Sequence, residues 1–250
     1  MINLKTTREL RYMRDAGKIS QEALLKAGEA VRPGVSTLEL DKIVRRTIEK
    51  AGAVPSFLGY GGFPASACIS VNNVVIHGIP SAHEILKEGD IVSIDVGAIY
   101  EGFNGDNAWT FPCGKVSEEA QKLMDATRES LFLAIEKAVP GNRIGDIGSA
   151  VQQYVEARNY SVVREFVGNG VGAKLHEDPS VPNYGTPGRG VRLLPGMTIA
   201  IEPMVTQGSC EVKILKDGWT TVTKDGKLAA HFEHSIAITP DGPVILTSLD

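Results

Sequence analysis

The sequence contains few cysteines, few aromatic residues and no long apolar run. Three cysteines, Cys68, Cys113 and Cys210, occur among 250 residues, and none of them forms a CxxC motif. An odd number without that spacing speaks against a disulfide scaffold and a structural zinc site, so we expect reduced thiols. No eighteen consecutive residues are apolar, and the first ten contain no apolar signal core. We therefore expect a cytoplasmic protein without a membrane partner.

Charge of one sign is not concentrated either. The chain has 26 lysines and arginines against 30 aspartates and glutamates, a formal net charge of -4, and no long basic run. This balance gives no general electrostatic reason to expect nucleic acid as a partner. The hydrophobic content of 42% is sufficient for one large core or two fused half-cores. Since nothing marks an exposed apolar face, we expect a monomer.

Helix and strand signals alternate in blocks. The capping boxes Thr6-x-x-Glu9 and Ser36-x-x-Glu39 predict two helices, and Asp225-Gly226 predicts a hairpin turn. Two helices followed by a group of strands, twice over, predict an α+β fold in which helices cover one side of an antiparallel sheet. We expect four helices: two that begin at the capping boxes and end near residues 30 and 52, and two that span about 118–138 and 145–158. The expected strands include 69–71, 90–96, 198–201 and 235–239.

Two parts of the chain resemble each other at an interval that is constant for the helices and the strand ends, while the register slips by a few residues between helix and strand. EGDIVSIDVG ends its apolar strand on Asp95, PGMTIAIEPM ends the equivalent strand on Glu202, and a His-x-x-Pro motif occurs at both His77 and His176. A repeated unit of about a hundred residues is too long for a solenoid. We therefore expect a single domain, 1–250, with two pseudo-symmetric half-domains at about 31–112 and 138–240 and a binding cleft between them.

Two further carboxylates, Asp106 and Glu233, lie in strand-like segments behind Asp95 and Glu202. Taken singly, an acid at a strand end is more often a turn former, and a lone histidine is more often structural. The duplication favours a shared role instead. Four carboxylates cannot converge inside a sheet without a cation, because repulsion and desolvation would protonate them. Such a set suits two divalent ions about 3.5 to 4 Å apart.

These motifs, in this order, strongly resemble those of the type I methionine aminopeptidases, which have the pita-bread fold. The resemblance covers essentially the whole chain and rests on four stretches. The chain is similar to the short bacterial form, without the zinc-binding extension of eukaryotic cytosolic members. The stretches are CISVNNVVIHGIP at 68–80, IDVG at 94–97, GNGVG at 168–172 with His176, and IEPM at 201–204 with Glu233.

The resemblance implies a metal-dependent hydrolase that removes the N-terminal methionine from nascent proteins and peptides. It implies two divalent ions, manganese, iron, cobalt or zinc. Asp95 would bind one ion through both oxygens, Asp106 and Glu233 would bridge the pair, and Glu202 would bind the second. The family's remaining ligand is a histidine, and Asn169 stands in its place. An amide is weaker than imidazole toward transition metals, so we expect a weakened second site with a preference for harder ions such as manganese.

By the same resemblance, Glu202 accepts the proton of the attacking water and later delivers it to the leaving amine. His176 stabilises the oxyanion, and His77 hydrogen-bonds the peptide. Contact with the ribosome is a further possible partner interaction that the resemblance implies. The pocket for the methionine side chain would be lined by Phe57, Tyr60, Phe63, Cys68, Leu175, Met204 and Trp219. Phe57 and Leu175 depart from the cysteine and phenylalanine common at these positions in bacterial members, although both are apolar.

Two other functions fit parts of the pattern. Aminopeptidase P and prolidase-like enzymes use similar acids but cut before proline, and they generally carry an additional N-terminal domain. A pita-bread protein that has lost catalysis and binds peptides is the other alternative, and Asn169 is the feature that favours it. The four carboxylates and two histidines favour an enzyme, because a binding module has no physical need to keep them together.

Overall fold

The helices begin where the sequence supplies N-caps. In a computed structural model that describes residues 2–249, the hydroxyls of Thr6 and Ser36 each accept a backbone N–H at 3.3 Å, from Glu9 and Glu39 respectively. Both glutamates accept the N–H of their cap in return, so both predicted capping boxes form. The helices are α1 (Thr7–Glu29), α2 (Thr37–Lys50), α3 (Glu118–Glu136) and α4 (Ile144–Glu156), and a short 3-10 turn covers Tyr60–Gly62.

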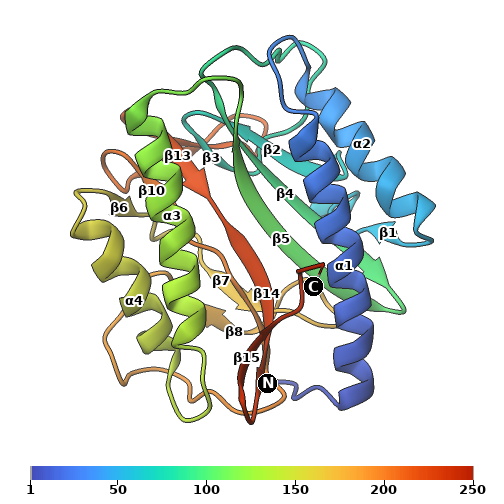
Figure 1. Ribbon diagram of the computed structural model, residues 1–250, viewed down its shortest axis with the longest axis vertical. Coiled ribbons are helices and arrows are strands. Elements are labelled where there is room, and N and C mark those ends of the chain that lie inside the picture. The colour runs from blue at the N-terminus through green and yellow to red at the C-terminus, as the bar shows by residue number, and fades with distance from the viewer. Residues whose placement is uncertain (1, 250) are drawn as a thin grey trace.

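Most strands join one antiparallel sheet, which Figure 1 shows running behind the helices. Its hydrogen-bonded order is β1-β4-β5-β14-β9-β7-β8, with β2 also paired to β4 and β15 also paired to β14. These nine strands are β1 (Val54–Pro55), β2 (Ala67–Val71), β4 (Ile91–Tyr100), β5 (Phe103–Pro112), β7 (Gly168–Gly170), β8 (Glu177–Val181), β9 (Thr198–Ile201), β14 (Glu233–Thr239) and β15 (Gly242–Ile245).

Two smaller sheets flank the large one and carry loops of the candidate site. They are ordered β13-β10-β6 and β11-β12-β3. The predicted Asp225-Gly226 hairpin is wrong, because β12 pairs with β11 and β3 whereas β13 pairs with β10. Their strands are β3 (Val74–Ile76), β6 (Ser161–Val162), β10 (Met204–Thr206), β11 (Val212–Ile214), β12 (Thr221–Thr223) and β13 (Ala229–His231).

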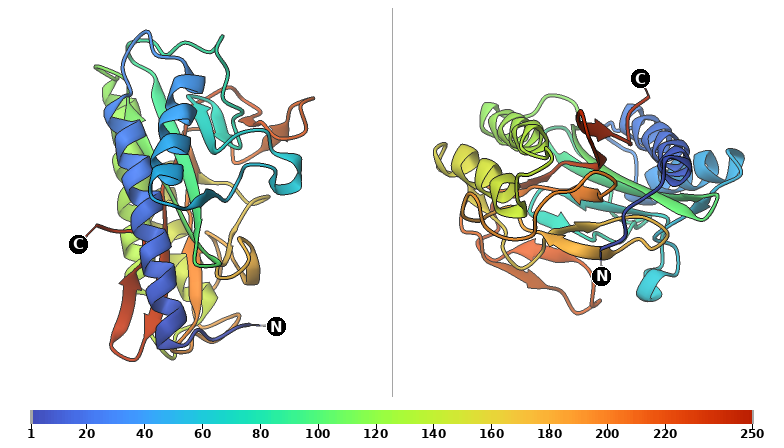
Figure 2. Two further views of the ribbon diagram at one scale, coloured as in Figure 1. Left: turned by 90° about the vertical axis from the view of Figure 1, so that its right-hand side faces the viewer. Right: turned by 90° about the horizontal axis from the view of Figure 1, so that it is seen from below.

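All four helices lie on one side of the large sheet, as Figure 2 shows, and the two small sheets lie on the other. Helix α1 packs on β4 and β5, α2 packs on β2, and α3 and α4 pack on each other over the other half of the sheet. One close approach is between Gly17 of α1 and Gly105 of β5, where a Cβ on Gly105 would collide with the helix backbone. The predicted α+β fold, with helices covering one side of an antiparallel sheet, is confirmed.

Corresponding elements of the two halves keep the constant interval seen in the sequence. The start of α4 follows the start of α2 by the same interval by which β6 follows β1 and β9 follows β4. Each half has its own apolar core, one centred on α1, α2 and β4 and the other on α3, α4, β9 and β14. No helix between residues 2 and 249 combines the length and apolar character that crossing a membrane requires.

Candidate active site

Three adjacent strands place carboxylates in one row across the sheet face that lies away from the helices. Ala108 in β5 lies opposite Asp95 in β4 and opposite Glu233 in β14. Residues directly opposite each other in an antiparallel pair point to the same face. Asp106, two residues from Ala108 on β5, shares that face because side chains alternate along a strand. The small Ala108 methyl therefore lies between two acids and leaves space above it.

The row continues at both ends. Ile201 of β9 pairs with His234, so the next residue along the chain, Glu202, comes beside Glu233. At the other end, Cys68 of β2 pairs with Asp95. The structure thus brings together all four acids that the sequence singled out. One terminates β9 and one begins β14, whereas the two aspartates lie within the ten-residue strands β4 and β5.

These carboxylates lack the partners that buried acids normally have. Asp106 and Glu233 are 7% and 2% exposed, and neither Asp106 Oδ1, Glu233 Oε1 nor Asp95 Oδ1 has a hydrogen-bond partner among residues 2–249. Burial raises the pKa of Asp106 to about 7. Burial, and then the neighbouring acids, raise the pKa values of Asp95, Glu202 and Glu233 well above their usual range.

A divalent cation fits this set of side chains. Ligand oxygens of Asp95, Asp106 and Glu233 lie within 4.8 Å of one another, and so do ligand atoms of Glu202, His231 and Glu233. Ionised carboxylates at such separations repel each other unless positive charge lies between them. The unpartnered oxygens are also the ligand type that hard divalent ions prefer. The buried acids therefore fit a metal centre better than they fit a core without metal.

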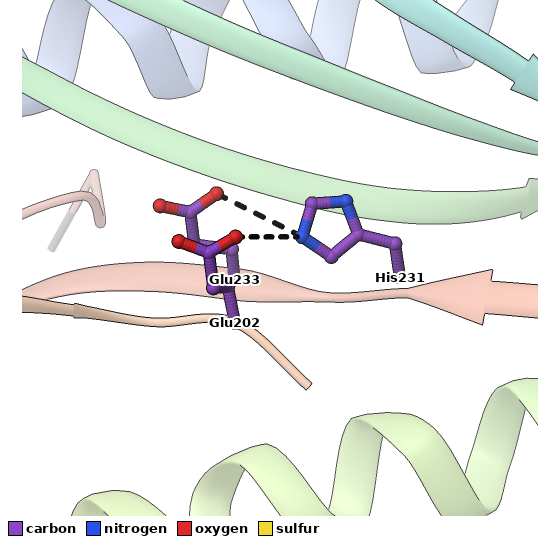
Figure 3. Close-up of side chains that lie close together, drawn as sticks. All are labelled: Glu202, His231 and Glu233. Carbon is purple, nitrogen blue, oxygen red and sulfur yellow. Dashed lines mark ion pairs between the residues drawn. The ribbon is translucent and has the colours of Figure 1, made fainter. Parts of the chain in front are cut away.

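His231 is a member of this centre that the sequence analysis missed. Its Nε2 points toward both glutamates, 3.9 Å from Glu202 Oε2 and 4.0 Å from Glu233 Oε2 (Figure 3). Burial lowers the pKa of His231 to about 3, so the imidazole is neutral and these contacts are not charged pairs. The signal was the spacing His231-Phe232-Glu233, because residues two apart on a strand share a face.

A cavity of about 120 Å³ opens beside the acids. Its apolar wall is an aromatic and aliphatic cluster in which the rings of Phe63 and Trp219 meet edge to face at 5.2 Å. Met204 does not line this cavity. It is fully buried with Val75 and Ile76 instead. The lining comprises Phe57, Tyr60, Phe63, Cys68, His77, Asp95, Asp106, Leu175, His176, Glu202, Trp219 and Glu233.

The two histidines of the His-x-x-Pro motifs lie at the edge of this cavity. His176 Nδ1 is 2.7 Å from the hydroxyl of Tyr60, which comes from the other half of the chain. His77 adopts a left-handed backbone, with φ of 58°, and its ring contacts Phe166 and Trp219 edge to face. Such a backbone is uncommon for a non-glycine residue and is often found at functional sites. Burial lowers the pKa of His77 to about 4 and lowers that of His176, so both rings are neutral.

Asn169 lies in an adjoining cavity that it shares with His77, His176 and Glu202. Its Nδ2 donates hydrogen bonds to the carbonyls of Gly170, at 2.8 Å, and Leu175, at 3.2 Å. With the nitrogen committed to the loop, only Oδ1 of the amide is left to bind a cation. Asn169 thus lines a cavity that Glu202 also lines, with its amide nitrogen bonded to the loop.

Comparisons with known proteins agree with this arrangement. The chain matches metallopeptidase family M24 over residues 11–240. It is 59% identical to a methionine aminopeptidase of Clostridium perfringens and 54% identical to methionine aminopeptidase 1 of Bacillus subtilis, each time over 99% of both chains. The crystal structure of a methionine aminopeptidase from Thermotoga maritima has a TM-score of 0.98 and 47% identity, covering 99% of this chain and 100% of that one.

Similarity of this extent confirms the resemblance seen in the motifs and favours it over the prolidase-like and non-catalytic alternatives. The buried acids, the neutral histidines and the small apolar cavity are the parts that a metal-dependent peptidase needs. The chain belongs to metallopeptidase family M24 and, within it, to the methionine aminopeptidases, hydrolases that use divalent metal.

Proposed function

We propose that the chain removes the N-terminal methionine of nascent proteins and peptides with two divalent ions held by five residues. The ion is manganese, iron, cobalt or zinc, with manganese favoured by the oxygen-rich ligand set. When bound, such ions lower the pKa of water and polarise a carbonyl. The observation that carries the proposal is the row of unpartnered acids beside an apolar cavity. The proposed ligands are Asp95, Asp106, Asn169, Glu202 and Glu233.

Glu202 is the proposed general base and acid. It is the acid at the outer end of the row, its side chain is 17% exposed, and it lines both the main cavity and the adjoining one. Of the two glutamates it is therefore the one within reach of water. Its carboxylate takes a proton from the attacking water and later gives that proton to the nitrogen of the leaving amine, so the proton balance closes within one turnover.

The two histidines are proposed to hold the scissile peptide. Neutral imidazole can donate one hydrogen bond, and the hydroxyl of Tyr60 at Nδ1 of His176 fixes which side of that ring faces the cavity. His176 then donates to the oxygen on which negative charge develops. His77, held by its left-handed backbone and by contacts with two aromatic rings, donates to the peptide beside the scissile bond.

The proposed methionine pocket is the apolar end of the cavity. Phe57, Phe63, Cys68 and Leu175 are buried there, each 8% exposed or less, and Trp219 packs against them. Burial raises the pKa of the Cys68 thiol well above its usual range, so this side chain acts as a small apolar group. An unbranched thioether fits such a wall, whereas a charged side chain would lose its hydration without gaining a partner. Tyr60 completes the proposed set at the rim, whereas Met204, predicted to belong to it, packs in a different apolar cluster.

A single catalytic unit, residues 1–250, is proposed, to which both related segments contribute. The segment 31–112 supplies His77 and the two aspartates, and the segment 138–240 supplies Asn169, His176 and the two glutamates. We propose that this unit acts as a monomer in the cytoplasm and meets nascent chains at the ribosome. Cross-linking of purified protein to translating ribosomes, with size-exclusion chromatography of the free protein, tests these two points.

The experiment that tests the function is hydrolysis of Met-Ala-Ser after metal stripping and titration with manganese. The chain should release methionine in proportion to bound metal, and an Asp106→Asn variant should not. Substitution of Asp125, an exposed acid on α3, by asparagine is the matched control and should leave the rate unchanged. A chain that binds manganese but releases no methionine would contradict the proposal, and so would equal rates in all three proteins.

A further inference from the structure

His231 has a buried ring nitrogen that no protein group satisfies. The side chain is 2% exposed, and Nε2 has no hydrogen-bond partner within the described chain, residues 2–249. A buried polar atom without a partner destabilises a fold, and such atoms in native structures call for an explanation. The polar atoms that come closest to serving as its partners are carboxylate oxygens of Glu202 and Glu233.

The distances from Nε2 to these two oxygens show whether the atoms form hydrogen bonds or are placed to bind one ion. At 3.9 and 4.0 Å, Nε2 is too far from either oxygen for a hydrogen bond, which spans about 2.7–3.2 Å. Typical bonds of a divalent zinc ion are about 2.0–2.1 Å to histidine nitrogen and about 2.0–2.2 Å to carboxylate oxygen, so two ligand atoms on one ion lie about 3.4 Å apart at a tetrahedral angle and up to about 4.3 Å apart when opposite each other. Both observed separations fall between these values. The three atoms are thus close enough to bind one ion, with wide angles at the ion between the histidine and each glutamate.

The backbone of His231 is fixed on both sides. Its N–H donates to the hydroxyl of Thr110 at 3.0 Å, and the same hydroxyl donates to its carbonyl at 2.8 Å. The residue also pairs with Met204 across β10 and β13. The next side chain, Phe232, packs edge to face on Trp109 with centroids 4.7 Å apart. A ligand held this firmly loses little conformational freedom when it binds an ion.

We propose that Nε2 of His231 is a ligand of the divalent ion that Glu202 and Glu233 hold. It supplies the imidazole nitrogen that Asn169, an oxygen donor, does not. This inference rests on the proposed metal centre and extends its ligand set by one residue from β13. It also changes the expectation drawn from Asn169, because the second ion then keeps a nitrogen ligand and need not bind weakly.

The first test uses the unaltered chain loaded with manganese. Pulsed electron paramagnetic resonance detects nitrogen bound directly to Mn²⁺, and labelling the histidines with ¹⁵N changes the coupling in a known way. Histidine nitrogen coupling is expected in the unaltered chain and is expected to disappear in His231→Gln. The matched control is His234→Gln, which removes a buried imidazole beside Glu233 whose Nδ1 bonds to Thr247 at 2.8 Å, and which should keep the coupling.

The second test measures manganese affinity by calorimetry. His231→Gln should weaken one binding event by about 10- to 100-fold or more, as loss of a metal-site partner does. Asn169→His should change the affinity little in the unaltered chain but restore most of the loss in the His231→Gln background. A merely structural role for His231 would not produce this rescue, because position 169 lies on a different strand, β7, and a histidine there can replace His231 only by binding the same ion.

Each result decides between the two proposals. Nitrogen coupling that is absent in the unaltered chain, or that persists in His231→Gln, would overturn the role of His231 and leave the proposed function standing. No binding of manganese, iron, cobalt or zinc by the unaltered chain would overturn the metal centre itself. If His231→Gln does not fold, the ¹⁵N result on the unaltered chain still decides whether a histidine binds the ion, and His77→Gln and His176→Gln variants then show whether it is either of the other two.

Discussion

The two halves of the molecule contribute to the same centre with different chemistry. The first half supplies two aspartates, short side chains in the middle of the paired ten-residue strands β4 and β5. The second supplies two glutamates, longer side chains at the end of β9 and the start of β14, together with His231. Rigid strands and short acids fix the position of the centre, whereas strand ends and longer acids leave room for exchange of ligands. We therefore expect changes in the second half to adjust metal affinity.

The largest effects should come from the two buried acids, one from each half, that are proposed to bridge the ions. Asp106→Asn keeps the size of the side chain but removes a charge that faces the other acids, so we expect manganese affinity and methionine release to fall by more than about 100-fold. Glu233→Gln makes the corresponding change in the other half and should have a similar effect, since Glu233 is equally buried. Calorimetry and peptide hydrolysis check both variants. Retention of full metal affinity by either one would show that its half does not hold the ion.

Ala108 lies in the row between an acid of the first half, Asp95, and an acid of the second half, Glu233. Ala108→Val should lower stability by about 1–3 kcal/mol through overpacking and should also fill space between the acids. The matched control is Ala98→Val, an equally buried alanine that points to the helix side of β4. Denaturant unfolding with EDTA and with manganese distinguishes the two. Both should be destabilised in EDTA, but only Ala108→Val should lose the extra stability that manganese gives.

The pH dependence of the stability of the metal-free protein reports on the acids of both halves together. Burial raises the folded-state pKa values of all four acids, Asp106 to about 7 and the others well above their usual range, while the unfolded chain ionises near pH 4. The folded protein therefore holds protons that the unfolded chain has lost. These protons contribute to the free energy of unfolding at low pH, and the contribution is lost as pH rises through the folded-state pKa values. Above about pH 7.5 histidines are largely neutral in both states and do not interfere.

In EDTA, the free energy of unfolding should consequently fall as pH rises from the unfolded pKa near 4 through the folded pKa values of these acids, that of Asp106 lying near 7. Saturating manganese should remove this dependence, because the ions hold the carboxylates ionised. Urea unfolding at several pH values, with and without metal, makes the comparison. A metal-free stability that stays flat or rises over this range would mean that the acids are already ionised without metal.

Much of this could be predicted from the sequence because the signals were local. Capping boxes and β-branched segments placed the helices and the central strands, and the repeated apolar segments identified Asp95 and Glu202 as partners, although Asp95 lies within β4 and not, as predicted, at its end. The hairpin at Asp225-Gly226 could not be excluded locally, since partner choice among short strands depends on β3 and β10 elsewhere in the chain. His231 was missed although its spacing to Glu233 was visible in the sequence. Its aim toward Glu202 depends on how β9 and β14 align, which no local pattern states.

The smallest predicted effect concerns the link between the halves. Tyr60, 44% exposed, belongs to the first half, and its hydroxyl meets Nδ1 of His176 in the second. Tyr60→Phe removes one partly solvated hydrogen bond, so we expect kcat to fall by about 10-fold or less. Metal affinity should not change, because neither side chain belongs to the acid row. Steady-state kinetics with calorimetry tests this, and Tyr12→Phe, which removes the hydroxyl of a half-buried tyrosine on α1 that accepts a hydrogen bond from Arg8, is the control. Loss of metal affinity in Tyr60→Phe would mean that the hydroxyl supports the metal centre rather than the orientation of His176.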